Sequence, residues 1–353
     1  MENGTGSLFE TFSVTLNLII FTGLAGLIWI AGTRLSYYVD AIAEQTKIAR
    51  SILGLVLLAT VTELPEMVTT ITAASSGNGA LALNNMFGGV MLQLAVLAIA
   101  DIFVRQGTLT SYPRRQTAVI AGILSILSLS VLLAIYLIGD VVLIAHMGIG
   151  SIVIGVLYIL FIALLRHYEK RDIWSPVDLP DKKKIDDNGR NNAFDHLTLK
   201  KLAFFSLIST LIILVCGVAV VNLAETLADQ TGLGSSFIGV SLLAITTSLP
   251  ELSTSIAAVR VKAYTMAISN VFGSNLIMMF LVLPADLFFT QGPVLNQVDL
   301  SAAFALAAGI LLTSIYCAGL LTRSKVKVLG MGIDSFFVVL FYITSLMILY
   351  HLR

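Results

Sequence analysis

Charged residues are scarce in this chain of 353 residues: Asp, Glu, Lys and Arg make up 12% of it, against about 25% in soluble domains. The two cysteines, Cys216 and Cys317, both lie in apolar runs, so neither a disulfide nor a thiolate metal site is predicted. The four histidines lack zinc-site spacing, and no G-x-x-x-x-G-K-[S/T] phosphate loop occurs. These absences argue against a soluble enzyme and against ATP hydrolysis by this chain, and no cofactor is predicted.

Apolar residues dominate instead: 57% of the chain is hydrophobic, and the mean hydropathy is +0.93. A membrane-spanning helix needs about 20 apolar residues, and runs of this length predict an all-α integral membrane protein with ten transmembrane helices. The first run lacks a preceding basic segment, so it is interpreted as a span and not as a cleaved signal. The predicted spans are roughly 13–36, 46–75, 79–103, 116–138, 141–166, 200–225, 235–259, 262–289, 298–322 and 329–351.

Basic residues alternate between the predicted loops. The loops after the odd-numbered spans and the span ends that adjoin them, including Arg34, hold 20 of the 21 Lys and Arg residues, whereas the loops after the even-numbered spans hold none. Short basic loops face the cytoplasm. The pattern therefore predicts a multi-pass protein of the cell (inner) membrane with both termini outside the cytoplasm.

The chain consists of two similar halves. Shifting residues 51–103 by 185 positions onto 236–288 matches 19 of 53 residues without a gap. The halves 1–166 and 200–353 each contain five predicted spans, and the polar stretch 167–199 between them is predicted to be a cytoplasmic linker. Because five is odd, the second half enters the membrane in the opposite orientation, which predicts two inverted-topology five-helix repeats.

One segment of each repeat places a carboxylate beside a proline within an apolar run. These segments are Thr62-Glu63-Leu64-Pro65-Glu66 and Thr247-Ser248-Leu249-Pro250-Glu251. A carboxylate at bilayer depth costs about 2.5 kcal/mol or more and by default marks an ion or substrate path. Proline removes a backbone N–H, so each helix is expected to break there and to offer oxygen ligands beside the acid.

Helical spacing puts hydroxyl groups on the face that carries each glutamate. The first face holds Thr62, Glu66, Thr69 and Thr70, and the second holds Thr247, Glu251, Thr254 and Ser255. Two such faces opposite each other make an all-oxygen cage, the environment that Ca²⁺ and Na⁺ prefer. Threonines in membrane helices also bond to other helices, so the prediction depends chiefly on the two glutamates with their prolines.

Both repeats resemble the α-repeats of the cation/Ca²⁺ exchanger superfamily, which includes Na⁺/Ca²⁺ and Ca²⁺/H⁺ exchangers. The family pattern G-x-x-x-x-A-x-x-T-S-x-P-E-L, followed by G-N-x-x-G-S-N, is matched closely at 239–252 and 269–275, and in part at 54–66 and 84–89. The resemblance implies Ca²⁺ ligation by Glu66 and Glu251. The Na⁺ contacts that it implies are Thr62, Thr247, Ser248, Ser274 and the backbone carbonyls of Ala59 and Ala244.

The chain departs from the family pattern at several ligand positions. The family serine three residues before the first glutamate is Glu63 here, and the serine of the first G-S-N is Gly89. Where exchangers carry Asn or Asp, the two repeats have Gln93 and Met278. Neutral ligands are thus lost while one acid is gained.

Glu63 would add a third acid to Glu66 and Glu251. Three neighbouring carboxylates repel one another, so one of them should hold a proton when no cation is bound. Divalent binding would then compete with protons. Alternatively, Glu63 faces a cytoplasmic vestibule or forms a hydrogen bond as a neutral acid.

These features predict a secondary active antiporter that exchanges Ca²⁺ for Na⁺ by alternating access. The alternative is a Ca²⁺ (or other divalent)/H⁺ exchanger that uses Glu63 as an extra titrating acid, and a cation channel is favoured less. An intramembrane enzyme is not expected, because no nucleophile or cofactor motif accompanies the acids. The expected partners are the lipid bilayer and inorganic cations, with no nucleic acid and no obligate protein partner.

Two further sets of residues have open roles. Asp101 and Asp286, matched across the repeats, end their spans and either attract cations to the two entrances or are simply solvated. Methionines in the third and eighth spans are expected to pack rather than to bind a soft metal. They are Met86, Met91, Met278 and Met279.

Overall fold

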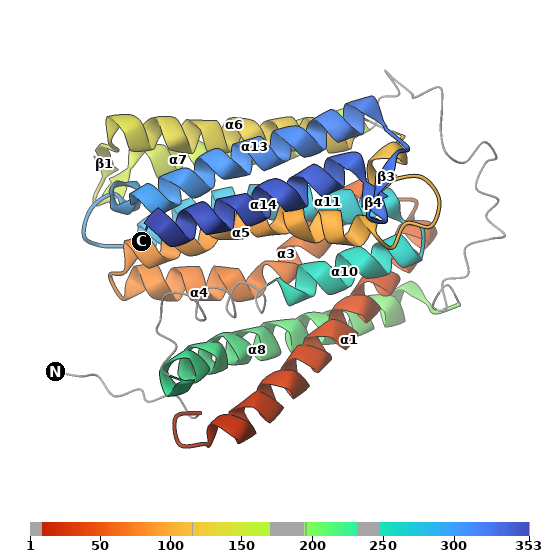
Figure 1. The fold of residues 1–353 in the computed structure, drawn as a ribbon, viewed down its shortest axis with the longest axis horizontal. Coiled ribbons are helices and arrows are strands. Elements are labelled where there is room, and N and C mark those ends of the chain that lie inside the picture. The colour runs from red at the N-terminus through yellow and green to blue at the C-terminus, as the bar shows by residue number, and fades with distance from the viewer. Residues whose placement is uncertain (1–8, 115, 170–193, 195, 232–247, 353) are drawn as a thin grey trace.

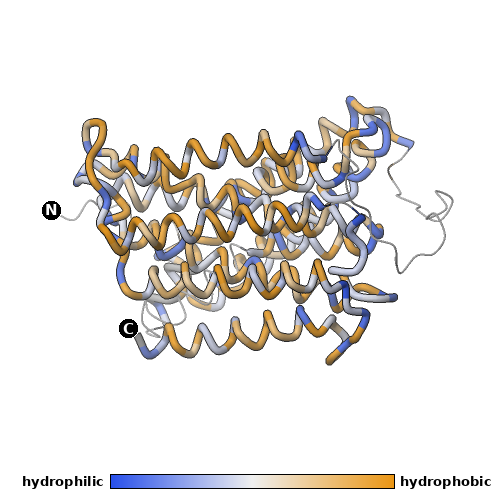
Figure 2. The backbone as a smooth tube through the Cα atoms, turned by 90° about the horizontal axis from the view of Figure 1, so that it is seen from above, coloured by the Kyte–Doolittle hydropathy of each residue, from blue (hydrophilic) through white to orange (hydrophobic). Residues whose placement is uncertain are grey.

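The protein is a bundle of long helices with two short β-hairpins (Figure 1). The computed structural model describes residues 9–114, 116–169, 194, 196–231 and 248–352. Hydrophobic residues run along the middle of the bundle, and hydrophilic residues gather mostly at its two ends (Figure 2). This distribution is typical of a protein that crosses a lipid bilayer.

Eight helices of the described residues are long and apolar enough to cross a membrane, and a bent pair makes a ninth candidate. The straight candidates are α1 (Val14–Thr46), α5 (Gly79–Asp101), α6 (Thr117–Ile138), α7 (Ile149–Glu169), α8 (Leu199–Thr231), α11 (Tyr264–Phe280) with α12 (Val282–Phe288), α13 (Leu300–Thr322) and α14 (Ile333–Leu352). The remaining predicted span, 235–259, is represented by α10 (Leu249–Arg260), because residues 232–247 lie outside the described part. Most of the predicted linker 167–199 lies outside it too.

The bent span contains the first acid–proline segment. It runs through α2 (Arg50–Ile52), the π-helix η1 (Leu53–Leu58), α3 (Ala59–Thr62) and α4 (Leu64–Ser75), and it bends by 49° at Glu63. Glu63 ends α3 and precedes α4 with φ −82° and ψ −3°, and Pro65 lies in the first turn of α4. Proline is tolerated in a first turn, where its missing N–H has no intrahelical partner to lose. The predicted break is confirmed.

The second acid–proline segment starts a helix in the same way. Ser248 precedes α10 with φ −86° and ψ 1°, and Pro250 again lies in the first turn. Both α4 and α10 are 12 residues long, and their first residues are separated by the repeat offset of 185 positions. The repeated sequence thus forms equivalent helices, each with a glutamate in its first turn.

Glycine brings the broken span into close contact with α11. A Cβ atom on Gly54 would lie 2.6 Å from the Met266 carbonyl oxygen, and one on Gly273 would lie 2.8 Å from the Leu55 Cα. Neither position has room for a side chain, because the obstructing atoms belong to the backbone. These two glycines therefore set the separation between η1 and α11.

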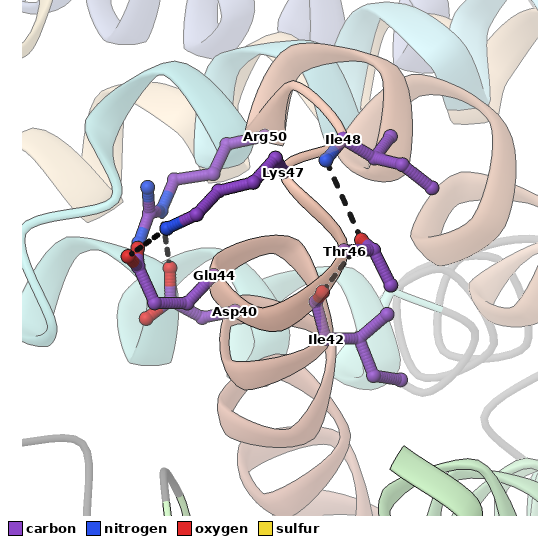
Figure 3. Close-up of polar contacts among 7 residues, drawn as sticks. All are labelled: Asp40, Ile42, Glu44, Thr46, Lys47, Ile48 and Arg50. Atoms are coloured by element: carbon purple, nitrogen blue, oxygen red, sulfur yellow. Dashed lines mark hydrogen bonds and ion pairs between the residues drawn. The ribbon is translucent and has the colours of Figure 1, made fainter.

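Helices α1 and α8 cross each other on one side of the bundle, beside α4 and α10, while α6, α7 and α13 lie on the opposite side (Figure 1). A charged turn connects α1 to α2 (Figure 3). There Arg50 Nε donates to Asp40 Oδ1 at 2.5 Å, and its Nη2 donates to Glu44 Oε2 at 3.0 Å. Lys47 ends α1 in the left-handed conformation with φ 57° and pairs with Glu44 at 3.0 Å.

Two antiparallel hairpins correct the all-α prediction and the starts of two spans. Strands β1 (Val142–Ile144) and β2 (Met147–Gly148) precede α7, and β3 (Lys327–Val328) and β4 (Met331–Gly332) precede α14. The spans predicted to start at 141 and 329 therefore begin several residues later. The apolar residues of the hairpins continue the hydrophobic runs, so composition alone does not separate strand from helix.

Asp101 and Asp286 are not solvated, so that interpretation was wrong. Each side chain is fully buried. Their oxygens accept backbone N–H and hydroxyl bonds from the short loop that follows and from the hairpin region. These hydrogen bonds hold the loop and the hairpin region against the end of the helix that carries each aspartate.

Candidate cation site

The helix breaks bring three glutamates together. One carboxylate oxygen each from Glu63, Glu66 and Glu251 lies within 4.8 Å of the other two. The side chains are almost fully buried, with exposed fractions of 1%, 3% and 1%. The prediction that Glu63 lies beside the two proline-linked glutamates is therefore correct in its geometry.

These carboxylates strongly favour a cation between them. Two unit charges 4.8 Å apart repel by roughly 3 kcal/mol at an effective dielectric constant of about 20. Glu66 and Glu251 lie in the first turns of α4 and α10, where the helix dipole stabilises negative charge, whereas Glu63 ends α3. A bound cation or a proton must therefore offset the remaining repulsion.

Several oxygen atoms around the acids have unused capacity. Among the described residues, Glu63 Oε2, both oxygens of Glu251 and the Ser274 hydroxyl are buried without a hydrogen bond of normal geometry. The Ser274 hydroxyl interacts with Glu63, and the Thr62 hydroxyl with Glu251, without meeting that geometry. Unsatisfied buried oxygens are costly, and an oxygen-binding cation would satisfy them.

The neutral ligands implied by the resemblance fall into three groups. Thr62 is buried beside the acids and donates to the Ala59 carbonyl at 3.2 Å, a carbonyl that also accepts the Glu63 N–H at 3.1 Å. Ser248 is buried at the start of α10. Thr247 and Ala244 lie outside the described residues. Of the other predicted hydroxyls, those of Thr70 and Ser255 are buried and unpaired within the described part, while Thr69 and Thr254 bond to backbone carbonyls.

Gln93 and Met278 occupy the places where the family pattern has other ligands. Gln93 Nε2 donates to Glu63 Oε1 and lies 3.6 Å from the sulfur of Met278. A Cβ atom on Gly89 would lie only 2.5 Å from the terminal methyl of Met278. The thioether thus occupies the space in which a serine at position 89 would lie, and the departures in the two repeats are mutually complementary.

Asn275 is a candidate that the sequence analysis did not select. It is fully buried on α11, and neither its oxygen nor its nitrogen has a hydrogen-bond partner in the described part of the chain. Its place in the second G-S-N segment was the available signal. Met86, Met91 and Met279 are buried in the hydrophobic core, as the packing interpretation predicted.

Fold and site together define a multi-pass helical membrane protein with a buried cluster of acids at a broken helix. The chain belongs to the family described as sodium/calcium exchanger protein, which matches residues 16–166 and 201–351. The recognition made from the two repeats is confirmed.

Relatives with known names or structures agree with this assignment. The chain is 26% identical over 277 residues to inner membrane protein YrbG of Escherichia coli (strain K12), covering 78% of this chain and 80% of that protein. It is 34% identical over 121 residues to sodium/calcium exchanger MaX1 of Methanosarcina acetivorans, covering 33% of this chain and 34% of that protein. Its fold is similar to that of the sodium-calcium exchanger NCX_Mj, with a TM-score of 0.70 at 18% identity over 95% of this chain and 99% of that one.

Proposed function

We propose that this protein is a secondary active antiporter of the cell (inner) membrane that exchanges Ca²⁺ for Na⁺ by alternating access. The observation that carries the proposal is the triad of Glu63, Glu66 and Glu251, whose oxygens lie within 4.8 Å of one another in the protein interior. Carboxylate oxygens are the hard ligands that Ca²⁺ prefers, and in this proposal Ca²⁺ is the transported ion. Family membership favours a transporter over an intramembrane enzyme.

The ligand assignment extends the triad with neutral oxygens. Glu66 and Glu251 bind the divalent cation, and Glu63 completes the negative charge. Thr62, Thr247, Ser248, Ser274, Gln93 and the carbonyls of Ala59 and Ala244 are the proposed neutral ligands. The unpaired Ser274 hydroxyl and Gln93 Oε1 support two of these assignments directly.

A divalent cation/H⁺ exchanger is the second candidate, and the contacts of Glu63 favour it. Gln93 bonds to Glu63, and Met278 occupies the space beside Gly89. Oxygen ligands that a Na⁺ ion would need are therefore missing at Gly89 and Met278, and a titrating acid is present at Glu63. A proton on Glu63 would do electrostatically what a bound Na⁺ does in an exchanger.

We further propose ten spans arranged as two inverted five-helix repeats, 1–166 and 200–353, joined by a cytoplasmic linker at 167–199, with both termini outside the cytoplasm. The equal lengths and spacing of α4 and α10 support the repeat. Cysteines introduced at 186–192 and at 225–232 should be labelled by an impermeant thiol reagent from opposite sides of the membrane. Labelling from one side would contradict the inversion.

Purified protein in liposomes tests the proposed function. Uptake of ⁴⁵Ca²⁺ is measured with an outward Na⁺ gradient, with an outward H⁺ gradient, and with neither. Exchange predicts uptake in one of the first two conditions and little in the third, and the effective gradient identifies the counter-ion. Equal uptake without any counter-gradient would indicate a channel instead.

A further inference from the structure

Asp101 lies at one end of the bundle and Asp286 at the other, and each accepts hydrogen bonds from two separate chain segments. Asp101 Oδ1 accepts the Leu109 N–H at 2.6 Å, and Oδ2 accepts the Gly332 N–H and the Ser335 hydroxyl, both at 2.7 Å. All three partners donate to the carboxylate, so both of its oxygens act as acceptors.

The same arrangement recurs in the other half of the chain. Asp286 accepts the Val294 N–H at 2.6 Å, the Gly148 N–H at 2.7 Å and the Ser151 hydroxyl at 2.5 Å. The two carboxylates therefore have equivalent structural roles. What differs between the two ends is the second acid beside each of them.

Asp334 is the second acid at the Asp101 end. It lies in the first turn of α14 and is 7% exposed. A Cβ atom on Gly332 would lie 2.5 Å from Asp334 Oδ1 and 3.0 Å from Asp101 Oδ2, so both carboxylates lie beside this glycine. Neither Asp334 oxygen accepts a hydrogen bond of normal geometry from a described residue, and the Thr110 hydroxyl and the N–H groups of that first turn are the donors that act on it.

The other end obtains its second acid from a different part of the chain. By the 184-residue spacing that relates Gly148 to Gly332, the equivalent of Asp334 is Gly150. Asp140, from the loop before β1, extends its Oδ2 to within 3.0 Å of where a Cβ on Gly150 would be. Asp140 is only half-buried, and its Oδ1 accepts N–H bonds from Val141 and Gly150, both at 2.9 Å. One oxygen of Asp140 is therefore satisfied by two N–H groups while its Oδ2 has no partner among the described residues, whereas neither oxygen of Asp334 is satisfied.

A neutral oxygen completes the surroundings of the Asp101 end. The Tyr316 hydroxyl of α13 is fully buried without a partner among the described residues, and the charges of Asp101 and Asp334 both act on it. The basic side chains nearby donate to backbone carbonyls: Lys327 to Val104 at 2.6 Å, and Arg323 to Pro113 at 2.6 Å. Among the described residues the cluster thus combines two carboxylates with one unpartnered neutral oxygen, that of Tyr316, and with the hydroxyl of Thr110, which lies 3.3 Å from that of Thr108.

We propose that Asp101 and Asp334 form a second binding site for a hard divalent cation of the Ca²⁺ class, with Tyr316 and Thr110 as neutral ligands. Two carboxylates neutralise one divalent ion, and oxygen is the ligand such ions prefer. Asp101 lies eight residues beyond Gln93 on α5, about 12 Å along the helix. The site is therefore separate from the glutamate triad and does not depend on the proposed function.

Binding of ⁴⁵Ca²⁺ by equilibrium dialysis tests this site in the full chain carrying Glu66→Gln and Glu251→Gln, which disable the triad. We expect saturable binding of about one Ca²⁺ per chain in that background. Adding Asp334→Asn should weaken it by about tenfold or more, since a charged ligand becomes neutral. Asp140→Asn is the matched control at the other end and should leave the affinity unchanged.

The absence of saturable binding in the triad-disabled background would overturn the proposal. Binding that survives Asp334→Asn undiminished would overturn it equally. Should Asp334→Asn fail to fold, Tyr316→Phe decides the matter, since it removes one neutral oxygen and keeps both charges. That variant should bind Ca²⁺ several-fold more weakly, and an unchanged affinity would contradict the assignment.

Discussion

The two helix breaks of this protein have nearly the same backbone and different chemistry. Glu63 and Ser248, 185 positions apart, have φ and ψ values within 4° of each other, and each precedes a 12-residue helix with proline in its first turn. Proline therefore determines the break, while the residue two positions before the proline differs between the repeats. A single change from hydroxyl to carboxylate at this point adds a third acid to the site without altering the path of the chain.

Removing a glutamate common to both breaks should have the largest effect. Glu66→Gln or Glu251→Gln keeps the side-chain volume and removes a charged ligand worth about 3 kcal/mol, which corresponds to a loss of divalent affinity of about 100-fold. Transport of ⁴⁵Ca²⁺ by reconstituted protein measures the effect. Glu44→Gln, in the last turn of α1, serves as the control and should transport normally. Near-normal exchange by either triad variant would refute the proposed site.

Matched glycines of the two repeats should differ in their tolerance of alanine. A Cβ on Gly273 would lie 2.8 Å from the Leu55 Cα, so Gly273→Ala should cost about 1–3 kcal/mol of stability through overpacking. A Cβ on its counterpart Gly88 would have no neighbouring atom within 4 Å, so Gly88→Ala should be nearly neutral. Thermal unfolding of the purified variants compares them. Equal melting temperatures would show that the packing of α11 against η1 does not limit stability.

Replacing the distinctive acid should make the first break resemble the second. Glu63→Ser removes one negative charge and one titrating group, so divalent binding should weaken by about tenfold and become less dependent on pH. In the native protein, affinity should rise with pH, because the cation displaces a proton shared among the three acids. Calorimetric titrations between pH 6 and 8 measure both slopes, and the preferred counter-ion should move from H⁺ towards Na⁺. An unchanged pH slope would place Glu63 outside the site and favour ordinary Na⁺/Ca²⁺ exchange.

The smallest effect, on stability, is expected from substitutions at the complementary pair Gly89 and Met278. Gly89→Ser restores the family hydroxyl but meets the flexible end of Met278, so it should destabilise the protein by about 1 kcal/mol or less. Adding Met278→Ala should relieve the contact, and the two changes should therefore be non-additive. A double-mutant cycle on thermal stability measures the coupling. Strict additivity would indicate that the two residues do not share this space.

Features that depend on local chemistry could be predicted from the sequence. Proline interrupts a helix or lies in its first turn, so the breaks at Pro65 and Pro250 could be predicted. The repeat predicted that Glu66 and Glu251 face each other, and Glu63 is only three residues from Glu66. The hairpins could not be predicted, because strands of only two or three residues are too short to show the alternating pattern that distinguishes a strand from a helix.

Features that depend on tertiary contacts could not be predicted from the sequence. The bonds of Asp101 come from Leu109 and from Gly332, which is 231 residues away, so a buried carboxylate looked like a helix-end acid open to solvent. Likewise, Met278 fills the space beside Gly89 from another helix, and no spacing rule predicts that contact. The sequence pattern identifies residues such as Asp101 and Met278, but it does not identify the residues that they contact.

The most direct test of the central claim is anomalous diffraction from crystals of the protein soaked in Sr²⁺, an electron-dense substitute for Ca²⁺. The account predicts one strong peak between Glu63, Glu66 and Glu251, with carboxylate oxygens of all three at about 2.3–2.6 Å or slightly more for the larger ion. The same peak should disappear in Glu251→Gln. A peak that is coordinated without Glu63, or density only outside the triad, would contradict it.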